Sequence, residues 1–161
     1  MAPELSGLFF RKLRTLYCSE LQLISFLPEL ASRAGDRGLR ATLNQEQELS
    51  RHRRDTLEVM AATHRISSAG DDCESMRRLI NEGRTVLRAA AWHFPGDDDL
   101  HSISGALHRV QILNYGVARS LANRMRLSED VAKLDSLVDQ LLDRYPETCD
   151  APVPAGLLAR Y

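Results

Sequence analysis

The sequence predicts an all-α protein: a four-helix bundle with a long crossover that carries a short fifth helix. Two observations lead to this prediction. Apolar residues recur at steps of three and four along four long segments, which is the spacing of amphipathic helices. The second and third of these segments are separated by a connection from His64 to Asp97, too long for a simple turn. A crossover of this kind lets the second and third long helices run parallel, as in ferritin-like bundles.

Each expected helix has its own apolar stripe and its own stop signal. The first stripe ends in a segment interrupted by Pro28, and Gly35 and Gly38 then break the pattern. Aspartates before Leu100 and the Ser128-Glu129 pair are typical of helix starts. The helices are expected at about residues 5–33, 39–63, 76–87, 100–125 and 128–146.

The length of 161 residues suits one domain, and we assign residues 1–146 to the bundle and 147–161 to an irregular, proline-containing tail. The net charge of −1 argues against nucleic acid as a partner. Neither a membrane-spanning run nor a leader segment is recognised, so the expected location is cytoplasmic and no membrane partner is expected. Cys18, Cys73 and Cys149 are odd in number and are expected to be reduced.

Glu20 is the residue that most needs an explanation. It lies on the apolar face of the first helix, between Leu16 and Leu23. A carboxylate that faces a core needs a partner, and a metal ion held by inward carboxylates is one partner that four-helix bundles provide.

Three segments resemble a known family. Residues 16–23 (LYCSELQL) are similar to its "LYSAEQQL" segment, and residues 73–83 (CESMRRLINEG) to its "C-x-AMEGLIxEG" crossover helix. Residues 114–122 (NYGVARSLA) are similar to its "xYGTxxxLA" motif. The family is the YciE/YciF group of bacterial, stress-associated, ferritin-like proteins. The resemblance implies a homodimer formed through helices and a metal site built from carboxylates on all four long helices.

When the family's metal ligands are aligned with this sequence position by position, most ligand positions hold other residues, so the metal site that the resemblance implies is degenerate. Glu20 matches the first carboxylate, but Leu49 and Arg53 occupy the second-helix positions. His108 and Gln111 occupy the third-helix glutamate positions. The fourth-helix carboxylate falls on Gln140 or, with a slip of one residue, on Asp139, and a later aspartate falls near Asp143 or Tyr145.

Two functional interpretations follow. In the first, the protein has lost its metals, a Glu20–Arg53 ion pair joined by His108 fills the site, and the protein acts through structural or partner interactions. In the second, Glu20, His108, Gln111 and Asp139 form an unusual iron or manganese site of a redox or metal-handling protein. The first interpretation, without cofactor or enzymatic activity, is favoured.

Two smaller possibilities stay open. Glu48 and His52 are spaced i, i+4 and could hold a single metal, although a solvated helix face is the ordinary explanation. Phe9 and Phe10 are adjacent and so cannot both face one core, which leaves one of them for an interface or for the crossover.

Overall fold

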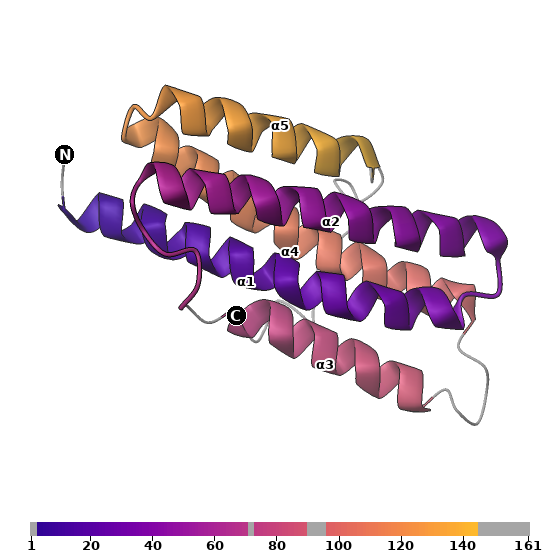
Figure 1. Ribbon diagram of the computed structural model, residues 1–161. Helices are drawn as coiled ribbons and strands as arrows, with labels where there is room; N and C mark the ends of the chain where they lie inside the picture. Colours follow the sequence, from indigo (N-terminus) through magenta and orange to yellow (C-terminus); the bar gives the residue numbers. More distant parts are fainter. Residues whose placement is uncertain (1–2, 71–72, 90–95, 145–161) are drawn as a thin grey trace.

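The protein is described by a computed structural model at residues 3–70, 73–89 and 96–144. These residues form five helices and no strand, as the sequence predicts. The helices are α1 (Pro3–Arg33), α2 (Arg37–Thr63), α3 (Glu74–Ala89), α4 (Asp97–Arg124) and α5 (Ser128–Arg144) (Figure 1). None of the described helices combines the length and apolarity that a bilayer crossing requires.

The ends of the helices follow from local chemistry. The backbone N–H of Leu39 donates to the side chain of Asp36 at 2.7 Å, so Asp36 caps α2 and the helix begins at Arg37, slightly earlier than predicted. Gly38 therefore lies inside the first turn of α2 rather than in a break. Pro28 is accommodated within α1, which continues to Arg33.

Contacts at both ends of the bundle show that α2 and α4 run in the same direction. At one end the Asp97 carboxylate accepts hydrogen bonds from the backbone N–H groups of Gly35 (2.9 Å) and Asp36 (2.8 Å). At the other end His64 Nε2 lies 2.6 Å from Asp130 Oδ2. The starts of α2 and α4 therefore lie together, and the end of α2 meets the start of α5, as the long crossover predicts.

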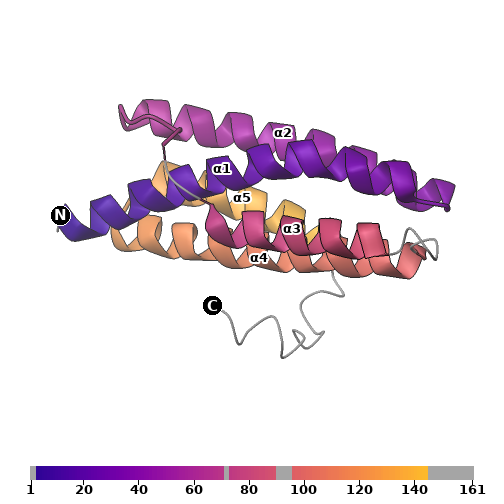
Figure 2. The same cartoon turned by 90° about the horizontal axis from the view of Figure 1, so that it is seen from below.

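The short crossover helix α3 packs on α1 and α4, on the side of the bundle away from α5 (Figures 1 and 2). Gly83 permits this close approach. A Cβ atom at that position would lie 3.1 Å from Cζ of Phe26 and 3.2 Å from Cγ2 of Ile103. Arg84 contacts α1 in the same region, donating from Nε and Nη2 to the carboxylate of Glu29.

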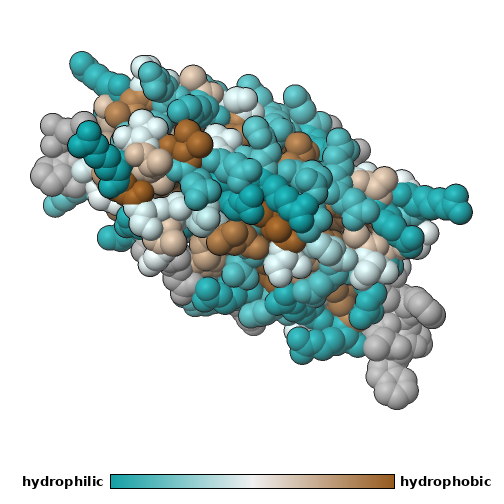
Figure 3. Space-filling view, viewed as in Figure 1, coloured by the Kyte–Doolittle hydropathy of each residue, from teal (hydrophilic) through white to brown (hydrophobic). Residues whose placement is uncertain are grey.

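The apolar core consists of two clusters that occupy different stretches of the bundle. One contains Leu23, Phe26 and Leu30 with the apolar face of α3, and the other contains Phe9, Leu13 and the apolar face of α5. The outer surface in Figure 3 is largely hydrophilic, and its hydrophobic residues lie in separate groups.

The redox state of two cysteines differs from the sequence-based prediction. Cys18 on α1 and Cys73, just before α3, form a disulfide, so the prediction of reduced thiols is wrong for this pair. The pairing depends on α3 folding back over α1, which spacing along the sequence does not reveal. Cys149 and the expected tail at 147–161 lie outside the described residues, so the division into bundle and tail stays a prediction.

Candidate functional site

A layer of buried polar side chains crosses the bundle between the two apolar clusters. In sequence its residues fall between those of the two clusters on α1, α2 and α4, except that Tyr115 also belongs to the cluster of Phe9 and Leu13. Each of its side chains is at most 2% exposed. The layer consists of Glu20 from α1, Glu46, Ser50 and Arg53 from α2, and His108, Gln111 and Tyr115 from α4.

Glu20 is the centre of this layer. Its Oε1 atom accepts hydrogen bonds from Arg53 Nε at 3.0 Å, Gln111 Nε2 at 2.9 Å and the Tyr115 hydroxyl at 2.7 Å. Its Oε2 atom accepts a hydrogen bond from the Ser50 hydroxyl. A carboxylate offers about four lone-pair positions. Four donors from α2 and α4 therefore match the number of hydrogen bonds that the Glu20 carboxylate can accept.

Arg53 links the two buried carboxylates. While Nε donates to Glu20, Nη2 donates to Glu46 Oε1 at 2.7 Å. Burial alone would lower the pKa of the Arg53 guanidinium, but the charges of Glu20 and Glu46 outweigh burial and raise this pKa. Arg53 is therefore a fixed cation in the middle of the bundle.

Glu46 has two further basic neighbours. His108 Nε2 lies 3.3 Å from its Oε1 atom, and Arg144 Nε donates to its Oε2 atom at 3.3 Å. Burial raises the pKa of Glu46, but the adjacent His108 imidazole and the charge of Arg53 outweigh burial, so this pKa is lowered overall. Glu46 is accordingly held in its anionic form.

The Tyr115 hydroxyl is kept in its protonated form. Its pKa is raised well above the ordinary value, first by complete burial and then by the charge of Glu20. A protonated hydroxyl can donate a hydrogen bond to Glu20, whereas a phenolate would repel that carboxylate.

Helix periodicity brings these side chains to one level. Glu46, Ser50 and Arg53 follow the i, i+4, i+7 spacing of one face of α2, and His108, Gln111 and Tyr115 follow i, i+3, i+7 on α4. Among the residues predicted from sequence, Glu20, Arg53, His108 and Gln111 come together here. Glu46, Ser50, Tyr115 and Arg144 were not predicted as site residues, although Tyr115 lies one helical turn beyond Gln111.

Several predicted positions lie elsewhere. Leu49 is only partly buried, because α2 turns Ser50 inward instead, so the expectation that Leu49 faces Glu20 is corrected. Asp139 is exposed on α5 and lies apart from the buried layer. Within the described part of the chain, the buried Oε1 atom of the neighbouring Gln140 has no hydrogen-bond partner. Glu48 and His52 are both exposed.

The donor set of the layer does not fit a binuclear metal centre. Such a centre uses several carboxylates and imidazoles to offset two dications. Here the charges of Glu20 and Glu46 are already matched by those of Arg53 and Arg144, both of which are in contact with the carboxylates. Among the described residues, no group of three or more His, Cys, Asp or Glu side chains is placed to hold a metal ion.

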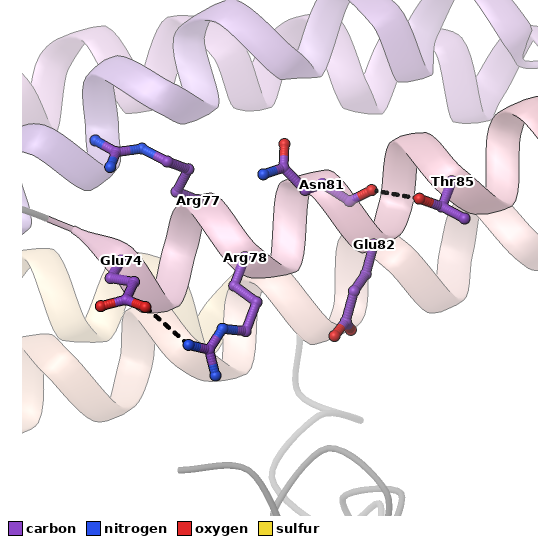
Figure 4. Close-up of a pocket in the computed structure, with 6 residues that line it drawn as sticks. All are labelled: Glu74, Arg77, Arg78, Asn81, Glu82 and Thr85. Atoms are coloured by element: carbon purple, nitrogen blue, oxygen red, sulfur yellow. Dashed lines mark hydrogen bonds and ion pairs between the residues drawn. The ribbon is translucent and has the colours of Figure 1, made fainter.

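A surface hollow of about 540 Å³ on α3 is a weaker candidate for a site (Figure 4). Its described lining comes from α3 alone, where Arg78 pairs with Glu74 at 2.8 Å and the Thr85 hydroxyl donates to the Asn81 carbonyl at 3.0 Å. These side chains project from one helix, and the described part of the chain offers no facing wall. The buried layer is therefore the better candidate for a functional site.

Comparisons with known proteins agree with this architecture. YcfI from Rhodopseudomonas palustris, described as a candidate structural protein, superposes with a TM-score of 0.83 at 18% identity over 95% of this chain and 99% of that one. The Escherichia coli stress protein YciF superposes with a TM-score of 0.82 at 18% identity over 93% and 94% of the two chains. At this identity the likeness establishes a shared fold. No curated protein matches the chain.

Residues 4–143 match the family described as a domain of unknown function, DUF892. Because this match spans most of the chain and the two similar structures share its fold, the protein belongs to this YciF-like family, as the motifs of its first and crossover helices predicted.

Proposed function

We propose that this protein is a stress-associated, ferritin-like protein that has lost di-metal binding and acts through structural or partner interactions. The observation that carries the proposal is the saturation of Glu20. Four donors, from Arg53, Gln111, Tyr115 and Ser50, occupy the carboxylate at which a metal would bind. The guanidinium of Arg53 also adds a permanent positive charge that opposes a dication.

The experiment is elemental analysis of protein purified from iron- and manganese-supplemented cells. The expected result is iron and manganese far below one ion per chain, both in the wild type and in Glu20→Ala. Stoichiometric metal in the wild type that is lost in Glu20→Ala would overturn the proposal. Glu48→Ala is the matched control, because Glu48 is an exposed carboxylate on α2.

The alternative, a metal-handling protein, is supported by one feature of His108. Its Nδ1 lies 3.2 Å from the Ser104 carbonyl oxygen, which leaves Nε2 directed toward Glu46. Metal-binding histidines often have this kind of backbone contact on the other ring nitrogen. A metal at Glu46 and His108 would require Arg53 to move away. Stoichiometric iron or manganese in the wild-type protein that is lost in His108→Ala would favour this alternative.

The partner that we propose is a second copy of the chain. On α4, Leu113 is 66% exposed and Val117 is 39% exposed, with the partly buried Val110 and Leu121 continuing the same stripe. Steps of three and four between these residues are the spacing with which helices pack against each other. A stripe of this kind can meet its own copy across a two-fold axis. The pair Phe9 and Phe10, considered from sequence, is less suitable, since Phe9 is buried and Phe10 packs against His64.

Analytical ultracentrifugation tests this interface. A dimer is expected for the wild type, and Leu113→Glu is expected to be monomeric while keeping its helical circular dichroism. Val59→Glu is the matched control, since Val59 is 57% exposed on α2, away from the stripe. A monomeric wild type, or a Leu113→Glu variant that remains dimeric, would contradict the proposed interface.

A further inference from the structure

The disulfide lies where α3 is attached to the bundle. Cys73 immediately precedes α3, and its carbonyl oxygen accepts a hydrogen bond from the backbone N–H of Arg77 in the first turn. Its partner Cys18 lies on α1, on the same helix as Glu20 but off the face that carries the buried layer. The bond therefore joins the start of the crossover helix to the bundle.

The other attachments of α3 are non-covalent. Its apolar face packs against α1 and α4, and the ion pair of Arg84 with Glu29 lies at the surface, where both side chains are about a third or more exposed. Exposed ion pairs contribute little to stability. An isolated helix the length of α3 is marginal in water, so its order depends on remaining packed. A covalent link at its start consequently has a large influence on how often it detaches.

Cys18 and Cys73 differ in their exposure to solvent. Cys73 is 2% exposed, whereas Cys18 is partly buried. A thiolate that approaches from solvent therefore meets Cys18 first. This asymmetry gives the bond a defined point of attack, because exchange requires the attacking thiolate to reach one sulfur.

We propose that Cys18 and Cys73 form a thiol–disulfide exchange site that controls the attachment of α3, with small or protein dithiols as its reductants. The attacking thiolate bonds to Cys18 Sγ, the bond between the two protein sulfurs breaks, and Cys73 leaves as a thiolate that takes up a proton. The second thiol of the reductant then displaces Cys18 as a thiolate, which is protonated in turn. The reductant becomes a cyclic or intramolecular disulfide, having supplied the two electrons and two protons.

Re-formation of the bond uses a hydroperoxide as oxidant. The thiolate of one cysteine attacks the peroxide, which gives a sulfenic acid and an alcohol or water, and the other cysteine displaces hydroxide to close the disulfide. With hydrogen peroxide the overall change is two thiols and one peroxide to one disulfide and two waters. In the reduced form α3 separates more often from α1 and α4, and residues such as Met76 and Ile80 become transiently accessible to a partner.

The experiment uses the full chain carrying Cys149→Ser, so that the only thiols are those of the pair. Thiols are counted by alkylation and mass spectrometry after dithiothreitol treatment and again after hydrogen peroxide. Amide hydrogen exchange is measured in both states for α3 and, as an internal reference, for α5. We expect two thiols to appear under native conditions, to disappear with peroxide, and α3 to exchange at least about tenfold faster when reduced, with α5 unchanged.

A Cys18→Ser variant in the same background provides the matched control. Its α3 is expected to exchange as fast as in the reduced protein, with or without dithiothreitol. Equal α3 exchange in the two redox states would overturn the proposal. So would thiols that are released only when the protein unfolds, or thiols that peroxide fails to rejoin.

Discussion

Arg53 Nε and Glu20 Oε1 are joined by a 3.0 Å hydrogen bond between two side chains that are each 1% exposed. Removing one member of such a pair leaves the other as an uncompensated buried charge, which costs about 3–5 kcal/mol of folding free energy. We expect Arg53→Met to lose that amount in urea denaturation at neutral pH, and Glu20→Gln to lose less, because Arg53 keeps its ion pair with Glu46. The double variant is expected to lose much less than the sum of the two.

The exposed pair of Glu29 with Arg84 is the matched control for this cycle. Its coupling energy is expected to be below about 1 kcal/mol, because solvent screens an exposed ion pair. Additive losses for Glu20→Gln and Arg53→Met would mean that the two side chains do not depend on each other.

The loss of folding stability at acidic pH should depend on Glu46. Its pKa in the folded protein lies below the ordinary value of 4.5, so its contribution to stability is fully present above pH 4.5 and is lost as the pH falls through the folded pKa. Glu46→Gln removes this titration. We therefore expect the free energy of unfolding of the variant to fall less steeply below pH 4.5 than that of the wild type.

Urea denaturation over a series of acidic buffers measures this slope. Glu48→Gln serves as the control, since Glu48 is an exposed carboxylate on the same helix, and it should retain the wild-type slope. Parallel pH profiles for Glu46→Gln and the wild type would rule out the proposed role of Glu46 in acid unfolding.

The loss of folding stability at alkaline pH should depend on Tyr115. Its raised pKa means that the unfolded chain releases the phenolic proton before the folded one does, so stability falls as the pH rises above about 10. Tyr115→Phe should lose about 1–3 kcal/mol at neutral pH, because Glu20 loses a donor, yet decline less steeply above pH 10. Denaturation at alkaline pH tests this, with the half-buried Tyr17→Phe as control.

The disulfide should also contribute to equilibrium stability. Cys18 and Cys73 are 55 residues apart, and closing a loop of this size in the unfolded chain corresponds to about 4 kcal/mol in the chain-entropy description. Cys18→Ser is expected to approach this loss under oxidising conditions and to equal the wild type once dithiothreitol is present. A Cys18→Ser variant as stable as the oxidised wild type would contradict the expectation.

The close approach of α3 should be sensitive to side-chain size at Gly83. Val at this position would overlap the Phe26 ring and Ile103, at a cost of about 1–3 kcal/mol for overpacking. Gly116 on α4 has no atom within 4 Å of an added Cβ, so Gly116→Val should be neutral or slightly stabilising. Thermal unfolding of the two variants distinguishes packing at Gly83 from a general effect of glycine replacement.

The helices could be predicted closely because their apolar stripes are long and regular. Glu20 was recognised for the same reason, as a charge that interrupts such a stripe. The rotation of α2 was harder to predict, since a shift of one residue turns a helix by about 100°, which is enough to exchange Leu49 for Ser50 at the buried face. The resemblance to the family could not supply the rotation of α2, because residues 46–53 of this chain do not match the carboxylate motif with which they were aligned.

Contacts between distant segments could not be predicted from periodicity. Arg144, near the end of α5, reaches the Thr42 carbonyl at 3.0 Å and the Gln45 side chain at 2.8 Å in addition to Glu46. Cys18 likewise meets Cys73 only because α3 lies on α1. Such pairs depend on how whole helices are placed, and helical spacing within one segment carries no information about that placement.

The two hydrogen bonds that Asp97 accepts from Gly35 and Asp36 join α4 to the turn between α1 and α2 through main-chain donors. Backbone amides have fixed positions relative to their helices, whereas apolar side chains can repack when one helix slides by a turn. Asp97 thus sets the axial register between the two helical hairpins independently of the core. This fixed register keeps Glu20, Arg53 and Tyr115 at one height along the bundle.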